Sequence, residues 1–112
     1  ETSCALSAAD AMFVCLVRAQ GEVDPTQFSQ AALGDLLSDR NVHLMESLDA
    51  LFHYGSAVDA AAGLGIHVQT MRQRLRRIND ITSRDIFNAW DRSVLGAACL
   101  ARPSRRAETL SR

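Results

Sequence analysis

Apolar residues recur at helical spacing in successive segments of this chain, and turn-forming residues separate those segments. A sustained alternation of apolar and polar residues, which would indicate strands, is absent, and aromatic residues make up only 5% of the composition. We therefore expect an all-α fold of five to six helices.

Capping residues, among them Ser7 with Asp10 three residues later, and glycines set the limits of the expected helices. Asp24 followed by Pro25 is a typical helix start, because the aspartate accepts hydrogen bonds from the first N–H groups and proline has no N–H group to leave unpaired. Gly55 is a natural helix end. The helices are expected at about residues 7–20, 24–37, 42–53, 56–62, 68–79 and 89–101, with Asn88 capping the last one and Pro103 ending it.

The composition excludes several kinds of protein. With 47% apolar and 22% charged residues, 112 residues suffice for one ordinary globular domain without disulfides. The longest apolar run, residues 11–17, is far shorter than the ~20 residues that span a membrane. We therefore expect a cytoplasmic protein without membrane contact. Of the few aromatic residues, Phe87 and Trp90 are expected to anchor the last helix to the core.

Motifs for catalysis or metal binding are lacking in the sequence. The three cysteines form no C-x-x-C pair, and His43 and His53 lie too far apart to share a metal ion on one helix. The chain has no nucleophile motif, no paired carboxylates and no glycine-rich phosphate loop. We expect no enzyme activity, no cofactor and no metal site.

Charge is distributed unevenly along the chain. Residues 1–62 contain two arginines and nine acidic residues, a net charge of −7, whereas residues 63–112 contain ten arginines and four acidic residues, a net charge of +6. The formal net charge of −1 hides this difference. The asymmetry predicts a basic surface on one part of the molecule.

Residues 56–78, SAVDAAAGLGIHVQTMRQRLRRI, have the pattern of a helix-turn-helix. Small residues at Ala60 and Ala61 allow two helices to approach closely, and Gly65 can adopt the positive φ of a tight turn. On the second helix, Met71, Leu75 and Ile78 form one buried stripe.

The opposite side of this second helix is polar and basic. Four arginines and no acidic residue lie between Ile66 and Ile78, and Arg72 repels Arg76 at a spacing of four residues. A polyanionic partner would relieve this repulsion, and arginine binds both phosphate and guanine. We expect contacts to double-stranded DNA, with base contacts from Val68, Gln69, Arg72 and Gln73 and phosphate contacts from His67, Thr70, Arg74, Arg76 and Arg77.

Two other interpretations of the arginines remain open. In the first, the arginines only solvate a surface helix; in the second, they pair with the acidic first half of the chain. A helical protein-interaction module, whose arginine-rich face docks an acidic partner, is the alternative function.

The sequence around these residues resembles the C-terminal helix-turn-helix of PucR-type transcriptional regulators, which is related to the Fis-type motif. The usual form is close to AARRLFVHRNTLRYRLRRIEELTG, and here it stands as AAAGLGIHVQTMRQRLRRINDITS. The resemblance covers about residues 33–101. The matching positions in the motif are Ala60, Ala61, Leu64, His67, Thr70, Arg72, Arg74, Leu75, Arg76, Arg77 and Ile78, with Leu44, Glu46, Leu48, Leu51 and Gly55 upstream and Thr82, Asp91 and Arg92 downstream.

The departures from the family form concern the tip of the recognition helix. Val68 and Gln69 replace Arg and Asn, and Gln73 replaces Tyr. Gly63 replaces Arg in the short helix and should weaken it by up to ~1 kcal/mol relative to alanine. These changes leave the target sequence open.

The resemblance also implies a domain organisation. Residues 39–102 are expected to be the DNA-binding domain of a bacterial transcription regulator, residues 1–38 a connector or dimer contact, and residues 103–112 a basic flexible tail. Members of this family usually carry upstream sensing domains, so the chain is expected to be the effector part of a longer protein. One such unit contacts few base pairs, which predicts a homodimer on paired half-sites.

Overall fold

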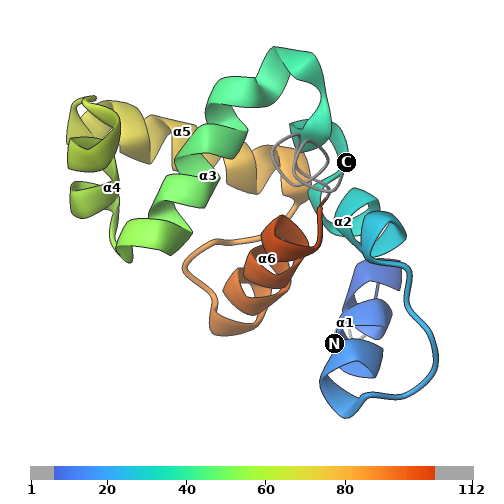
Figure 1. The fold of residues 1–112 in the computed structure, drawn as a ribbon. Coiled ribbons are helices and arrows are strands. Elements are labelled where there is room, and N and C mark those ends of the chain that lie inside the picture. Colours follow the sequence, from blue (N-terminus) through green and yellow to red (C-terminus); the bar gives the residue numbers. More distant parts are fainter. Residues whose placement is uncertain (1–6, 103–112) are drawn as a thin grey trace, which may run out of the picture.

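A computed structural model describes residues 7–102, which form six α-helices, two short 3₁₀ segments and no strand (Figure 1). The predicted all-α fold is thereby confirmed. The elements are α1 (Ala8–Arg18), α2 (Pro25–Leu33), η1 (Gly34–Leu37), η2 (Asp39–Asn41), α3 (Val42–Tyr54), α4 (Ala57–Leu64), α5 (Val68–Thr82) and α6 (Ala89–Ala101). The expected flexible tail and the stop at Pro103 lie outside the described residues.

Side-chain caps begin the helices where the sequence predicts them. Ser7 and Asp10 form a reciprocal capping box at the start of α1. The Asp24 side chain accepts a hydrogen bond from the Thr26 N–H group at 3.0 Å, and Asn88 caps α6 in the same way.

Three helix ends differ from the expected positions. The second helix stops at Leu33, because Gly34 has a φ of +52° and turns the chain into η1 instead of continuing to Leu37. Helix α4 continues through Gly63, and α5 extends beyond Asn79 to Thr82.

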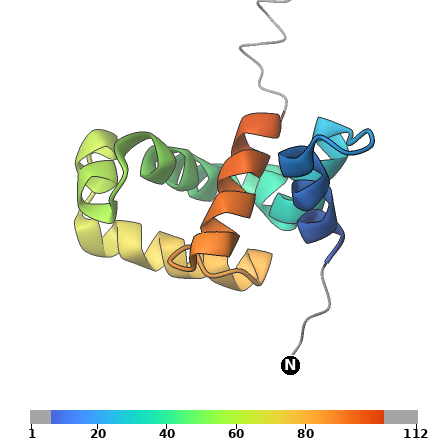
Figure 2. The same ribbon diagram turned by 90° about the horizontal axis from the view of Figure 1, so that it is seen from below.

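The helices pack in two groups that share one core. Helices α3, α4 and α5 contact one another, whereas α2 packs mainly against α6 and also against α1. Viewed from below, the green and yellow helices α3, α4 and α5 lie at one end, the blue helices α1 and α2 lie at the other, and α6 crosses between them (Figure 2). Segment η1 contacts α2, α3 and α5 and joins the two groups.

The core joins apolar side chains from all of these helices. Its largest fully buried members are Phe28, Leu33, Leu36, Leu44, Leu48, Leu51, Met71, Leu75, Ile78, Ile86, Val94 and Leu95. Within residues 7–102, no helix is long and apolar enough to cross a membrane.

The expected anchor of the last helix is wrong in part. Phe87 is 68% exposed and Trp90 is 42% exposed, whereas their neighbour Ile86 is fully buried. The Ile86 N–H group donates to the Asn79 side chain at 3.0 Å, which fixes the loop after α5 with Ile86 facing the core. Trp90 lies at the periphery, where its ring packs edge-on to Phe13 of α1.

Candidate nucleic-acid interface

Helix α4 is the first helix of the helix-turn-helix and packs against both α3 and α5. The Ser56 side chain caps it by accepting from the Asp59 N–H group at 3.1 Å. Ala60 and Ala61 are fully buried at these contacts, as their small size predicts. An ideal Cβ atom on Gly63 would lie 2.3 Å from the Tyr54 ring, so glycine at this position leaves room for that ring beside α4.

The turn between α4 and α5 depends on Gly65. Its φ is +70°, in the left-handed region that favours glycine. The Ile66 N–H group donates to the Ala61 carbonyl oxygen at 3.0 Å, which closes the end of α4. Ile66 is half-buried against the core, so the direction in which α5 leaves the turn is fixed by packing.

His67 is the N-cap of α5. Its Nδ1 atom accepts a hydrogen bond from the Gln69 N–H group at 3.0 Å. Because this bond orients the ring at the start of the helix, the exposed imidazole has only Nε2 left to offer to a ligand.

The outer face of α5 carries the largest share of the predicted site. Met71, Leu75 and Ile78 are buried on the inner face, as predicted. The exposed positions of the helix are Gln69, Arg72, Gln73, Arg76, Arg77 and Asp80. None of the three arginines in that set forms an ion pair or a hydrogen bond with any residue in the range 7–102.

Three predicted site residues are less accessible than those on the exposed face. Arg74 is half-buried, and its Nη1 atom donates to the Ser47 Oγ atom of α3 at 3.1 Å. Val68 and Thr70 are also half-buried, and Val68 packs against the core. The structure therefore brings Gln69, Arg72, Gln73, Arg76 and Arg77 together on one surface. Arg74 is bonded to α3, Val68 packs against the core, and Thr70 is half-buried.

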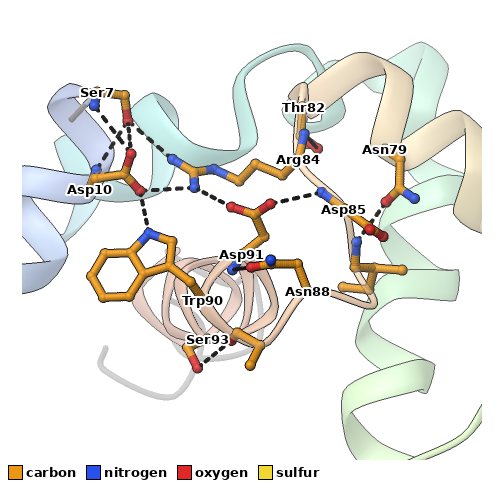
Figure 3. Close-up of polar contacts among 12 residues, drawn as sticks. Ser7, Asp10, Asn79, Thr82, Arg84, Asp85, Asn88, Trp90, Asp91 and Ser93 are labelled. Carbon is orange, nitrogen blue, oxygen red and sulfur yellow. Dashed lines mark hydrogen bonds and ion pairs between the residues drawn. The ribbon is translucent and has the colours of Figure 1, made fainter. Parts of the chain in front are cut away.

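Away from this exposed face, Arg84 is mostly buried and paired with acidic residues (Figure 3). The Arg84 Nη1 atom lies 2.9 Å from Asp10 Oδ1 and 3.0 Å from Asp91 Oδ1, and its Nη2 atom donates to the Ser7 hydroxyl. Trp90 Nε1 also donates to Asp10, at 2.8 Å. This cluster, which we call the Arg84 cluster (Ser7, Asp10, Arg84, Trp90 and Asp91), fastens α1 to the loop between α5 and α6.

Hydrogen bonding dominates the electrostatics of the Arg84 cluster. Burial alone would raise the pKa of Asp10, but hydrogen bonds from Trp90, Arg84 and Ser7 lower it to about 2. The sequence alone did not reveal the cluster, because Arg84 and Asp10 are separated by 74 positions. The only local signal was the capping pair of Ser7 and Asp10, which indicated a helix start and nothing more.

A second paired arginine, Arg102, closes the end of α6. It pairs with Asp49 of α3, beside the mostly buried thiol of Cys99. Burial raises the pKa of Asp49 despite this pairing, and burial together with Asp49 raises the pKa of Cys99 to about 12. Cys99 is therefore an unreactive packing residue.

The ion pairs test whether the α5 arginines pair with the acidic first half of the chain. Asp10, Asp35 and Asp49 of the acidic first half all pair with arginines, but with Arg84, Arg40 and Arg102 respectively. Within residues 7–102 no acidic residue of the first half therefore forms an ion pair with an α5 arginine. The described part of the chain thus does not show the pairing with the acidic first half that was one of the alternative interpretations.

Known proteins match the segment that contains this surface. Residues 44–101, more than half of the chain, match the family model of the PucR C-terminal helix-turn-helix domain. An uncharacterised protein of Mycobacterium tuberculosis is 43% identical over 63 residues, which cover 55% of this chain and 15% of that protein, and one of Mycobacterium bovis matches equally. The transcriptional activator PmfR of Paenarthrobacter nicotinovorans is 50% identical over 46 residues, 41% of this chain and 10% of PmfR.

The matching segments thus span a small part of these longer relatives. No solved structure matches the chain.

Proposed function

This chain belongs to the family of PucR C-terminal helix-turn-helix domains, and from this membership we propose that it binds double-stranded DNA sequence-specifically as the effector domain of a bacterial transcription regulator. The observation that carries the proposal is the outer face of α5. Arg72, Arg76 and Arg77 are exposed there, and no residue in the range 7–102 neutralises them. The similarity to PmfR, a transcriptional activator by name, supports the regulatory role.

The placement of α5 supports distinct roles for its residues. Recognition helices contact base edges with their N-terminal turns, where Gln69, Arg72 and Gln73 are exposed. Glutamine can bond both edge groups of adenine, and arginine can bridge O6 and N7 of guanine. Arg76 and Arg77 lie one to two turns further along and contact phosphates in this proposal, as does His67 through Nε2.

The half-buried residues have a smaller part in DNA contact. The Arg74 hydrogen bond to Ser47 holds α5 against α3, so in the proposed complex Arg74 positions the recognition helix and meets phosphate only at its edge. Thr70 adds a peripheral phosphate contact. Val68 offers methyl groups at the rim of the groove, where a thymine methyl would suit them better than a charged group.

The other parts of the protein have separate roles in this proposal. We propose that residues 39–102 are the DNA-binding domain and that residues 1–38 connect it to upstream sensing domains or form a dimer contact. One recognition helix covers few base pairs, so two copies would bind half-sites about one helical turn apart. The greater length of the relatives supports further domains in the whole protein.

A binding experiment tests the DNA proposal. Duplexes selected from a random pool by the unaltered protein would be titrated with that protein and with an Arg72, Arg76 and Arg77 triple-alanine variant. We expect the triple variant to lose at least about 100-fold in affinity at 50 mM salt, since several phosphate and base contacts disappear together. Helical circular dichroism and a thermal melt establish that the variant is folded.

The salt dependence separates the proposal from the protein-interaction alternative. Binding through about four to six phosphates gives a steep log-log dependence of affinity on salt. Failure to select any duplex at 50 mM salt, or equal binding by the triple variant, would contradict DNA recognition by α5. Retained binding to an acidic protein partner would then favour the interaction module.

A further inference from the structure

An open polar hollow lies beside the C-terminal half of α5, on the flank that the proposed base contacts do not use. Segments η1 and η2, the first turn of α3 and α5 all contribute to it. Its lining residues are Asp35, Arg40, Asn41, His43, Arg77 and Ile81.

The wall formed by η1 and η2 is held in place by the backbone. Asn41 is buried, and its Nδ2 atom donates to the Asp35 carbonyl oxygen at 2.9 Å. Arg40 Nη2 pairs with Asp35 Oδ2 at 2.6 Å, yet the Arg40 side chain remains 75% exposed. Arg40 therefore keeps further N–H donors open to solvent on a fixed turn.

Arg77 connects this hollow to the outer face of α5. It is exposed, lies next to Arg76 in sequence and pairs with no acidic residue in the range 7–102. The hollow thus holds two arginines, the exposed His43 and one carboxylate, so its balance of charge favours an anion. It is also continuous with the surface proposed to bind DNA.

The length of α5 brings this hollow near a DNA backbone. Its 15 residues extend about 22 Å at 1.5 Å per residue, whereas the major groove is about 12 Å wide. When the N-terminal turns lie in the groove, the C-terminal turns leave it and pass the phosphates at its rim. Arg77 and the η2 turn line the hollow beside these C-terminal turns of α5.

We propose that this hollow binds a backbone phosphate flanking the major groove, with Arg40 and Arg77 as donors and His43 at its edge. The inference rests on the proposed DNA binding and adds to it a contact from outside the helix-turn-helix. Asp35 competes with the phosphate for Arg40 and repels it. Removal of the Asp35 charge should therefore strengthen DNA binding, and removal of Arg40 should weaken it.

The test compares three single variants with the unaltered protein on its selected duplex. Affinity would be measured by fluorescence anisotropy between 50 and 300 mM salt for Arg40→Ala, Asp35→Asn and Arg18→Ala. Arg18 is the matched control, because it is an exposed arginine on α1, a helix that packs on α2 and α6 and takes no part in the hollow. Arg40→Ala and Arg18→Ala change the net charge equally.

The expected results differ in size and sign. Affinity falls as about the 0.9 power of the salt concentration for each phosphate contact. Arg40→Ala should therefore weaken binding roughly 5- to 10-fold at 0.1 M salt and make the log-log slope shallower by about 1. Asp35→Asn should strengthen binding about 2- to 5-fold. Arg18→Ala should change affinity less than about 2-fold.

Two outcomes would overturn the inference while leaving the proposed function intact. One is an equal effect of Arg40→Ala and Arg18→Ala, which would reduce Arg40 to a distant charge. The other is that Arg40→Ala binds the duplex as well as the unaltered protein does but no longer binds inorganic phosphate. Phosphate binding would be measured by nuclear magnetic resonance of the His43 ring. That result would make the hollow a site for a free small anion. Failure of the unaltered protein to bind any duplex would instead contradict the proposed function itself.

Discussion

Two regions of this molecule use arginine in opposite ways. In the Arg84 cluster, one guanidinium is mostly buried and contacts two carboxylates and a hydroxyl. On the outer face of α5, three guanidinium groups are exposed and meet no acidic partner within residues 7–102. The same residue type thus fastens helices together in one region and leaves charge uncompensated in the other, where only a partner from outside the fold can neutralise it.

The energetic consequences of the two arrangements differ in sign. Removing one member of a mostly buried ion pair leaves an uncompensated charge and destabilises a protein strongly. Removing one of two like charges spaced four residues apart on a helix relieves a repulsion of about 0.2 to 0.5 kcal/mol. The Arg84 cluster therefore contributes to stability, whereas the α5 face lowers stability slightly and is available for binding.

The largest expected effect is on the Arg84 cluster. Arg84→Ala should lower the free energy of unfolding by about 2 to 4 kcal/mol, because Asp10 and Asp91 would face each other without their shared cation. Chemical denaturation measures this change, and Arg18→Ala, which removes an exposed arginine from α1, is the control. A loss below about 0.5 kcal/mol would place Arg84 in the same class as a surface arginine and break the comparison.

The next effect is on the α5 face and appears in DNA binding. Arg72→Ala should cost about 1 to 3 kcal/mol of binding free energy and relax the preference at one base position, because Arg72 lies on the exposed N-terminal half of α5. Arg76→Ala should weaken binding to all sequences alike. Selection experiments with each variant measure the two patterns, and a loss of specificity in Arg76→Ala alone would exchange the proposed roles.

Acid titration sharpens the comparison from the side of the carboxylates. The pKa of Asp10 is lowered from 3.8 to about 2 in the fold, so its contribution to stability is fully present above pH 3.8 and is lost as the pH falls through 2. We expect the difference in stability between the unaltered protein and Asp10→Asn, about 1 to 2 kcal/mol near pH 6, to shrink between pH 4 and pH 2. A pH-independent difference would show that Asp10 acts through packing alone.

How much of the fold and of the candidate site was predictable from the sequence depends on whether the contacts are local or join distant segments. The caps at Ser7, Asp24 and Asn88 and the turn at Gly65 are local, and their signals lie within a few residues of each other. The buried stripe of α5 follows from helical periodicity alone. These features were predicted correctly because no distant part of the chain alters them.

The misplaced features involve contacts between distant segments. The sequence pattern predicted a phosphate contact for Arg74 but gave no sign that Ser47 of α3 would accept its hydrogen bond. Hydrophobicity favoured Phe87 and Trp90 as anchors, whereas the Asn79 hydrogen bond fixes Ile86 in the core instead. Such pairings are set by tertiary packing, which a single sequence does not display.

The smallest expected effect tests the comparison on α5 without any DNA. Arg72→Gln removes one charge of the repelling pair with Arg76 while keeping a similar helix propensity, and no acidic residue lies three or four positions away from Arg72. We expect the free energy of unfolding to rise by about 0.2 to 0.5 kcal/mol at low salt, and this gain should disappear at 1 M salt because exposed charges are screened. The exposed and uncharged Gln73, replaced by alanine, controls for general changes in the helix.

A loss of stability in Arg72→Gln would mean that Arg72 already makes a favourable contact in the free protein. The α5 arginines would then resemble Arg84, and their charge would no longer indicate an external partner.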